Sequence, residues 1–286
     1  MAIPLVIYTF IFAYRPLSGW QMAFQDFRAN PRITEHPWVG FKHFSFLFRD
    51  NLFLSILRNT LAMSTINLVL SLITSITLAL LLNEIGNRIF KRITQTISYL
   101  PHFLSWVIVA SMVSDFLSST GLINTVLMGL KIIDSPILFL TQPKSFWWIF
   151  GWSSVWKGVG WGTIIYLAAI TSIDPELYEA AGIDGAGRLR KMWHITLPGI
   201  KSTIIVITIM NVGWILNAGY EPQYLLGNNL VLDYSETIDI FVIRYGIAMS
   251  NYSLATAAGM FKTVVSIILI TAANQTSRYF AHESLV

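Results

Sequence analysis

The sequence contains no cysteine and few charged residues. With no Cys in the chain, disulfides, thiolate metal sites and cysteine nucleophiles are excluded. The lack of Cys does not indicate a compartment, because such a chain suits either redox environment. Charged residues make up 12% of the sequence, about half the share usual in a soluble domain. Water is therefore not the only solvent of this protein.

Apolar and aromatic residues take the place of the missing charges. The chain is 54% hydrophobic and 14% aromatic, it holds 10 Trp, and its mean hydropathy is +0.60. These values predict an all-α polytopic membrane protein with one domain over residues 1–286. The net charge of +4 is too small and too scattered for a nucleic-acid surface, but it suits cytoplasmic loops beside anionic lipid.

Hydropathy predicts about six transmembrane helices. The clearest is the uncharged run 61–82, which at 1.5 Å per residue is about 33 Å long. In the next span we expect Pro101 in the first turn, where a missing N–H costs little. The other complete spans are predicted at 97–117, 146–173, 203–220 and 254–274.

The apolar segment 3–14 is only about half as long as a span needs to be. We expect it to be the end of a first span whose start lies upstream. A signal peptide is the alternative, but no basic residue precedes the apolar run and no small-residue cleavage site follows it.

The charges of the loops predict the orientation in the membrane, because Lys and Arg are retained on the cytoplasmic side. Loops 83–96 and 174–201 are basic and are predicted to be cytoplasmic, whereas the basic-poor loops 118–145 and 221–253 face outward. Segment 15–59 must then also be extracytoplasmic, although it carries six basic residues. Long loops follow the charge rule poorly.

Loop 174–201 is polar and contains residues typical of the starts and ends of two short helices. Asp174 and Pro175 suit the start of the first helix, and Gly182 suits its end. Asp184 is expected to cap the second helix, which Pro198 then ends. From physics alone, an interfacial element that binds anionic lipid is an equally good interpretation.

Seven residues of this loop carry a family pattern. Its form is EAA-x3-G-x9-I-x-L-P, and all its specified positions are present: Glu179, Ala180, Ala181, Gly185, Ile195, Leu197 and Pro198. The loop resembles that of the permease subunits of binding-protein-dependent ABC importers. The resemblance implies a type I importer permease fold in which this loop is the coupling element, seated in a cleft of a cytoplasmic ATPase subunit. We expect Gly185 to permit close approach at the pair of helices in this loop.

Motifs outside the loop extend the resemblance over nearly the whole chain. The chain is similar to the polysaccharide and oligosaccharide permeases of the maltose-importer superfamily, including those of alginate importers. Two departures are Ser202, where many members carry Pro, and the absence of a basic N-terminal extension. The motifs are Arg15-Pro-Leu-Ser-Gly-Trp, Ala23-Phe-Gln-Asp-Phe, Trp38-Val-Gly-Phe-Lys-His-Phe, Arg58-Asn-Thr, Ala79-Leu-Leu-Leu-Asn-Glu and Ser98-Tyr-Leu-Pro-His-Phe-Leu-Ser-Trp.

The resemblance implies a multi-pass subunit of the bacterial inner membrane with several partners. These are a second, unlike permease, two ATPase subunits, an extracytoplasmic binding protein and an oligosaccharide. The chain itself has no phosphate-binding G-x-x-x-x-G-K-[ST] loop, so ATP and Mg²⁺ are expected in the partner ATPase and no cofactor in this chain. Hydrolase motifs and zinc-ligand spacings are also absent, which indicates a transport subunit and not an enzyme.

Polar residues inside the spans are candidates for the substrate path. A mid-membrane Lys costs about 2.5 to 3.5 kcal/mol to insert, so Lys157 and Lys262 should face a wet cavity or a partner. Aromatic rings offer flat platforms to sugars, and an ammonium pairs well with a uronate carboxylate. The candidates are Ser154, Lys157, Trp161, Asn211, Trp214 and Lys262.

Other interpretations of these residues remain open. Trp148, Trp152 and Trp156 are more typical of packing or of an interfacial belt, and Lys262 can pair with the second permease. The two lysines favour an acidic saccharide weakly, and phospholipid or peptide cargo stays possible. An ion-driven secondary transporter would need inverted repeats and midplane carboxylates, which the sequence does not show. A lipid-binding scaffold is the other alternative, to be distinguished by whether an ATPase subunit co-purifies.

Overall fold

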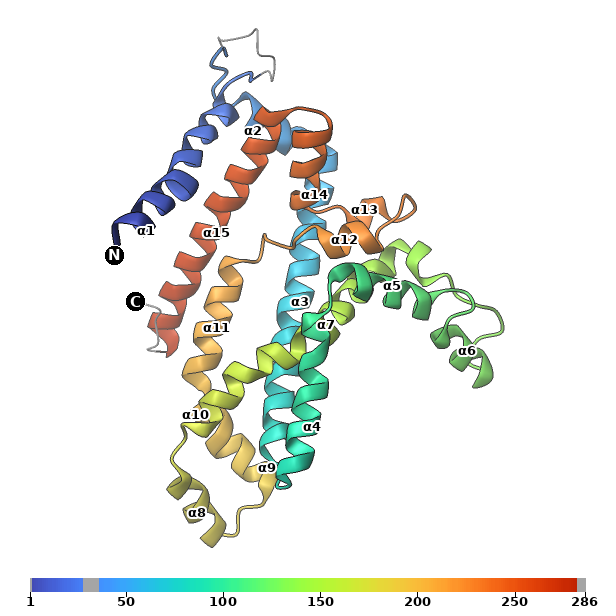
Figure 1. Cartoon of the computed structure of the whole chain (residues 1–286), viewed down its shortest axis with the longest axis vertical. Helices are drawn as coiled ribbons and strands as arrows, with labels where there is room; N and C mark the ends of the chain where they lie inside the picture. Colours follow the sequence, from blue (N-terminus) through green and yellow to red (C-terminus); the bar gives the residue numbers. More distant parts are fainter. Residues whose placement is uncertain (1, 28–35, 282–286) are drawn as a thin grey trace.

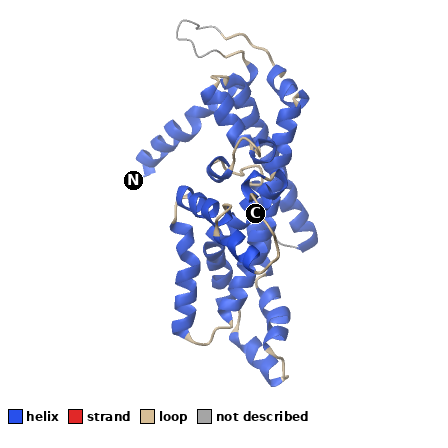
Figure 2. Cartoon of the chain, turned by 90° about the vertical axis from the view of Figure 1, so that its right-hand side faces the viewer, coloured by secondary structure: helices blue, strands red, loops and turns tan. Residues whose placement is uncertain are grey.

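The computed structural model describes residues 2–27 and 36–281, and Figures 1 and 2 show helices throughout this part of the chain. At its centre two long helices pack against each other, α3 (Asn51–Asn83) and α7 (Pro143–Thr171). α3 begins at Asp50, whose side chain accepts the N–H of Leu52 at 2.9 Å, a normal N-cap. The predicted spans 61–82 and 146–173 are thereby confirmed as helices.

The N-terminal segment is one nearly continuous helix of changing pitch. It comprises α1 (Ala2–Thr9), a π-helical turn (Phe10–Tyr14) and a 3₁₀ helix (Arg15–Phe24). The 3₁₀ part packs on the last helix, α15 (Tyr252–Ala281), as does α2 (Lys42–Arg49). The predicted extracytoplasmic segment 15–59 thus begins in this helix, and its residues 28–35 lie outside the described part of the chain.

The predicted span 97–117 is not one helix. α4 (Arg88–Tyr99) is followed by a 3₁₀ turn (Leu100–Phe103), and a new helix, α5 (Trp106–Leu117), starts after Ser105. Pro101 lies in this turn, at the end of α4 and not in the first turn of a span. The Ser105 side chain accepts the N–H of Ile108, which makes Ser105 the N-cap of α5. α6 (Leu122–Gly129) follows, and a 3₁₀ turn (Phe139–Thr141) leads into α7.

The loop after α7 contains two helical pieces, as predicted, but with other boundaries. α8 (Pro175–Ile183) is capped by Asp174 and runs through Gly182. The second piece starts at Arg188 and not at Asp184, because Gly187 is its N-cap. This piece consists of α9 (Arg188–Lys191), a π-helical turn (Met192–Thr196) and α10 (Leu197–Gly199), which are continuous, and it ends one residue after Pro198, close to the predicted position.

The predicted span 203–220 is shorter than expected. α11 (Lys201–Gly213) is bent by 58° from the piece before it and ends at Gly213. The following segment leads into α12 (Glu221–Leu226), α13 (Leu232–Ser235), α14 (Ile238–Ile243) and a π-helical turn (Arg244–Ala248). α15 then confirms the predicted span 254–274.

The apolar lengths fit a membrane protein. The segments Asn51–Asn83, Trp106–Gly129 and Tyr252–Tyr279 are long and apolar enough to cross a membrane, and the bent pair around Ile200 makes a fourth if it is one span. α7 has 29 residues, but neither it nor the N-terminal helix is among these segments, so six spans stay a prediction. Figure 1 places α8 and α9 at one end of the molecule and α2 and α14 at the other.

Candidate functional site

A cavity of about 1060 Å³ lies between the central helices. Residues of α3, α7 and α11 form its walls, together with the break between α4 and α5 and the segment that precedes α12. Its volume lies at the upper end of the range for ligand pockets. The polar and ionisable side chains in its lining are Asn67, Ser71, Ser75, His102, Ser105, Ser154, Lys157, Tyr166, Asn211, Asn217, Tyr220 and Glu221.

Lys157 is the one Lys or Arg among the described residues that line the cavity. Its Nζ donates to the carbonyl oxygen of His102 at 2.7 Å and lies 5.8 Å from the centre of the Trp106 ring. An ammonium group has three donors, and His102 takes only one. Lys157 is therefore oriented by the break between α4 and α5 while N–H donors remain for a ligand.

The break between α4 and α5 is held against α7 by two further contacts. The imidazole of His102 stacks on the indole of Trp161, with ring centres 4.6 Å apart and planes at 5°. Gly160 lets the backbones approach closely, because a Cβ there would overlap the carbonyl of Ser98. His102, from the Ser98–Trp106 motif, thus forms part of the cavity wall beside Lys157.

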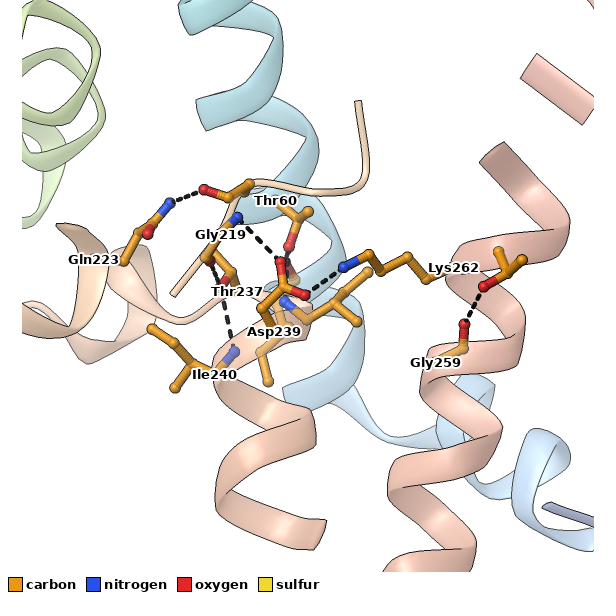
Figure 3. Close-up of polar contacts among 12 residues, drawn as sticks. Thr60, Gly219, Gln223, Thr237, Asp239, Ile240, Gly259 and Lys262 are labelled. Carbon is orange, nitrogen blue, oxygen red and sulfur yellow. Dashed lines mark hydrogen bonds and ion pairs between the residues drawn. The ribbon is translucent and has the colours of Figure 1, made fainter. Parts of the chain in front are cut away.

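Figure 3 shows the polar contacts at another wall of the cavity. Asp239 of α14 forms an ion pair with Lys262 of α15 and accepts the backbone N–H of Gly219 at 3.1 Å. Thr237 donates to the carbonyl of Gly219 at 3.1 Å. Gly219 has a φ of +79°, a backbone conformation that glycine adopts readily. These bonds fix the segment 217–222, which belongs to the lining.

The structure brings three of the six path candidates together. Ser154, Lys157 and Asn211 all line the cavity. Trp161 supports the wall through His102, Trp214 is 66% exposed just past the end of α11, and Lys262 is paired with Asp239. His102, Trp106 and Asn67 also line the cavity, and none of the three was predicted from the sequence. For Asn67 alone the sequence held an indication, because the polar positions of α3 lie on one face of that helix.

The seven pattern residues lie in the loop at the opposite end from α2. Glu179, Ala180 and Ala181 are in α8, whereas Ile195, Leu197 and Pro198 are in the second helical piece. Two bonds join the pieces: Lys191 Nζ donates to the Tyr178 carbonyl at 2.8 Å, and the Tyr178 and Thr196 hydroxyls lie 3.0 Å apart. The loop is therefore a bonded unit and not a loose connection.

Gly185 lies at the turn between the two pieces, with a φ of +75°. No atom lies within 4 Å of a Cβ placed there, so close approach within this chain does not explain the glycine. The left-handed backbone explains it, because a side chain costs about 1–2 kcal/mol in that region. The expectation of close packing at Gly185 is thus wrong for contacts inside the chain.

Large apolar side chains of the loop point into solvent. Ile183 is 89% exposed, and Leu177, Leu189 and Trp193 are also more than half exposed. Exposed apolar clusters of this kind mark interaction surfaces. The loop therefore presents a surface that this chain itself does not cover.

The segment 221–253 is bound to the start of α3 at the other end of the molecule. Arg58 and Asn59, from the Arg58-Asn-Thr motif, both donate to the carbonyl of Asp233, at 3.0 and 2.9 Å. Glu236 pairs with Arg244. Burial raises the pKa of the Glu236 carboxyl, the Arg244 charge lowers it and Asp233 raises it, with a net rise.

The described residues contain no group of three His, Cys, Asp or Glu side chains that could hold a metal ion. Helices with apolar outer surfaces, a polar cavity between them and a bonded loop at one end define a polytopic membrane transport protein. Residues 52–281 match the family of the binding-protein-dependent transport system inner membrane component. The chain belongs to this family, and it is a permease subunit of the bacterial inner membrane and not an enzyme.

Its relatives include two proteins of Bacillus subtilis (strain 168). Protein LplB is 43% identical, with 100% of this chain and 89% of LplB covered. The polygalacturonan/rhamnogalacturonan transport system permease protein YteP is also 43% identical, with 100% and 88% covered. A chain in the crystal structure of a bacterial alginate ABC transporter, in complex with an alginate pentasaccharide-bound periplasmic protein, matches with a TM-score of 0.89 and 40% identity. That match covers 100% of this chain and 95% of the other.

Proposed function

We propose that this chain forms part of the path through which an ATP-driven importer moves an acidic oligosaccharide. The observation that carries the proposal is Lys157, a cation held by His102 in the wall of a polar cavity. Ser154 and Asn211 supply neutral hydrogen-bonding groups to the same space. A sugar offers many hydroxyls, and a uronate adds a carboxylate that forms a charge-assisted bond with an ammonium.

The relatives support a saccharide of this class. One is a polygalacturonan/rhamnogalacturonan permease, and the structural neighbours come from importers of alginate, an acidic polysaccharide. A neutral oligosaccharide is the second candidate, and Glu221 favours it, because its carboxylate lies in the lining and repels an acidic ligand.

The loop 174–201 couples the path to ATP hydrolysis in this proposal. Its exposed Leu177, Ile183 and Leu189 dock on a cytoplasmic ATPase subunit, where ATP and Mg²⁺ bind. The hydrogen bonds of Lys191 and Tyr178 make the loop rigid enough to transmit a push. Because the loop is continuous with α11 and follows α7 directly, ATPase closure moves two walls of the cavity.

The complete importer has three further kinds of protein component. A second, unlike permease faces the cavity, two ATPase subunits bind the cytoplasmic side, and a binding protein delivers the saccharide to loops 118–145 and 221–253. Membrane lipid surrounds the assembly. Closure of the ATPase pair on ATP favours the outward-facing state over the inward-facing state, and the path therefore changes from inward-facing to outward-facing.

ATP hydrolysis by the reconstituted importer with its binding protein tests the proposal. We expect uronate oligosaccharides to stimulate hydrolysis more than neutral ones. Equal stimulation by neutral saccharides would agree with a saccharide importer but would refute the preference for an acidic substrate. No stimulation by any saccharide would refute a saccharide path.

A further inference from the structure

A second cavity, of about 640 Å³, lies on the other side of α7 from the polar one. We call it the Trp groove. It is formed between α7 and the pair α5 and α6, and its lining is almost entirely apolar. Its residues are Met112, Val113, Phe116, Leu117, Ile123, Lys144, Ser145, Trp148, Ile149, Trp152, Ser153 and Trp156.

Three tryptophans form one wall of the Trp groove at intervals of one helical turn. Trp148, Trp152 and Trp156 follow each other at i, i+4 and i+8, so they share one face of α7. Trp148 and Trp152 are 53% and 56% exposed. Large apolar area thus remains uncovered within this chain, and it needs an apolar occupant.

The Trp groove is charged at one end only. Lys144 is the single charged side chain among the described residues that line it, and Ser145 lies beside it. Lys144 is in the first turn of α7, at the end remote from α8, which follows the other end of α7. An elongated occupant must therefore be apolar along its length and anionic or polar at its outer end.

The length of the Trp groove matches one leaflet of a bilayer. Lys144 and Trp156 are twelve positions apart, which is about 18 Å at 1.5 Å per residue. One leaflet contributes about 15 Å of hydrocarbon, half of a core of roughly 30 Å. With Lys144 at the headgroup level, the bottom of the groove lies near the middle of the membrane.

The position of the Trp groove on α7 favours lipid over a second permease. Ser154, Lys157 and Gly158 face the polar cavity, whereas the three tryptophans face the opposite side of the helix. If the polar cavity is the path, it faces the second permease, and the Trp groove then faces away from it. This step rests on the proposed function.

We infer that the Trp groove binds one acyl chain of an anionic phospholipid of the outer leaflet, with the lipid phosphate at Lys144. The acyl chain covers the indole faces, and the ammonium group pairs with the phosphate. One basic residue near a charged lipid surface gives a preference of about fivefold for anionic over zwitterionic lipid. The site is thus selective for the headgroup charge and tolerant of the chain.

Quenching of tryptophan fluorescence by brominated lipids tests this inference on the whole importer in vesicles, without saccharide or ATP. Bromine on an acyl chain quenches indoles in contact with it. The signal of the Trp groove is the difference between wild type and Trp152→Phe, with Trp38→Phe as the control for an exposed indole outside the groove. We expect brominated phosphatidylglycerol to quench this signal at about fivefold lower mole fraction than brominated phosphatidylcholine.

Lys144→Gln should bring the two lipids to equal quenching, whereas Lys131→Gln, an exposed lysine outside the groove, should not. Equal quenching in wild type, or a preference that survives Lys144→Gln, would overturn the inference. So would a Trp152 signal that neither lipid quenches, since a protein subunit would then cover the groove. Stimulation of ATP hydrolysis by saccharides, measured on the same vesicles, reports separately on the proposed function.

Discussion

Lys262 and Asp239 form an ion pair that joins α15 to α14 beside the cavity. Asp239 also accepts the N–H of Gly219, whose segment lines the cavity (Figure 3). The side chains are 15% and 23% exposed, so both charges are largely withdrawn from solvent. Lys262, a candidate for the substrate path from its sequence, therefore stabilises a wall of the cavity through Asp239.

Asp239→Asn tests this pair. The one amide oxygen of Asn can still accept the Gly219 N–H, so the variant removes the charge and the acceptor for Lys262. We expect a lower thermal stability, by about 3 kcal/mol, because Lys262 is left as an unpaired, mostly buried charge. The double variant Asp239→Asn/Lys262→Met should recover much of the loss. If Asp239→Asn melts like the exposed control Asp134→Asn, the ion pair does not hold the wall.

Gly160→Ala tests the close contact between α4 and α7. The new methyl group would overlap the Ser98 carbonyl and lie 2.9 Å from Tyr99 Cδ1, so backbones must separate. We expect a loss of about 1–3 kcal/mol, measured by thermal unfolding of the purified complex. Gly158→Ala is the matched control, since nothing lies within 4 Å of its Cβ. Equal melting of the two variants would refute the contact.

Substitutions at Gly185 test the backbone conformation and the side-chain volume separately in the loop 174–201. Gly185→Asn should retain coupling, because Asn tolerates a positive φ, whereas Gly185→Ala should weaken the loop by about 1–2 kcal/mol. Gly185→Trp should abolish stimulated ATP hydrolysis and leave membrane insertion intact, because the space around its Cβ is open in this chain and the indole would meet the proposed ATPase surface. Gly187→Ala is the control with ordinary backbone. Normal transport by Gly185→Trp would remove the coupling assignment.

The buried Glu236 predicts a dependence of stability on pH. Burial raises the pKa of this carboxyl above its ordinary value of 4.5. The native state therefore binds more protons than the unfolded state between the two pKa values, and stability falls as pH rises through that window. Glu236→Gln should flatten this part of the curve of melting temperature against pH. A wild-type curve that rises there, with no change in the variant, would contradict the burial effect.

Long apolar runs were sufficient to predict α3, α7 and α15. The break at Ser105 was not predictable from hydropathy, since its neighbours Leu104 and Trp106 are apolar. The break at Ile200 was signalled by Pro198, two residues before it. The Ser105 cap was visible as a residue type, but Pro101 offered a competing start signal four residues earlier. Propensity alone could not decide between them.

The candidate site was partly predictable for a similar reason. Helical periodicity put Ser154 and Lys157 on one face of α7, and both line the cavity. The partners of the lysines come from other elements: the His102 carbonyl for Lys157 and Asp239 for Lys262. Such tertiary pairs depend on how helices pack, which residue spacing along one helix does not contain.

Uptake of labelled oligosaccharides into vesicles by Lys157→Ala, Lys157→Arg and wild-type importer tests the central claim most directly. We expect Lys157→Ala to raise the KM for a uronate oligosaccharide by at least about tenfold, because one charge-assisted bond is lost. The KM for a neutral oligosaccharide should stay the same, and Lys157→Arg should keep most of the uronate affinity. An unchanged KM for the uronate oligosaccharide in Lys157→Ala would show that Lys157 does not bind an acidic saccharide.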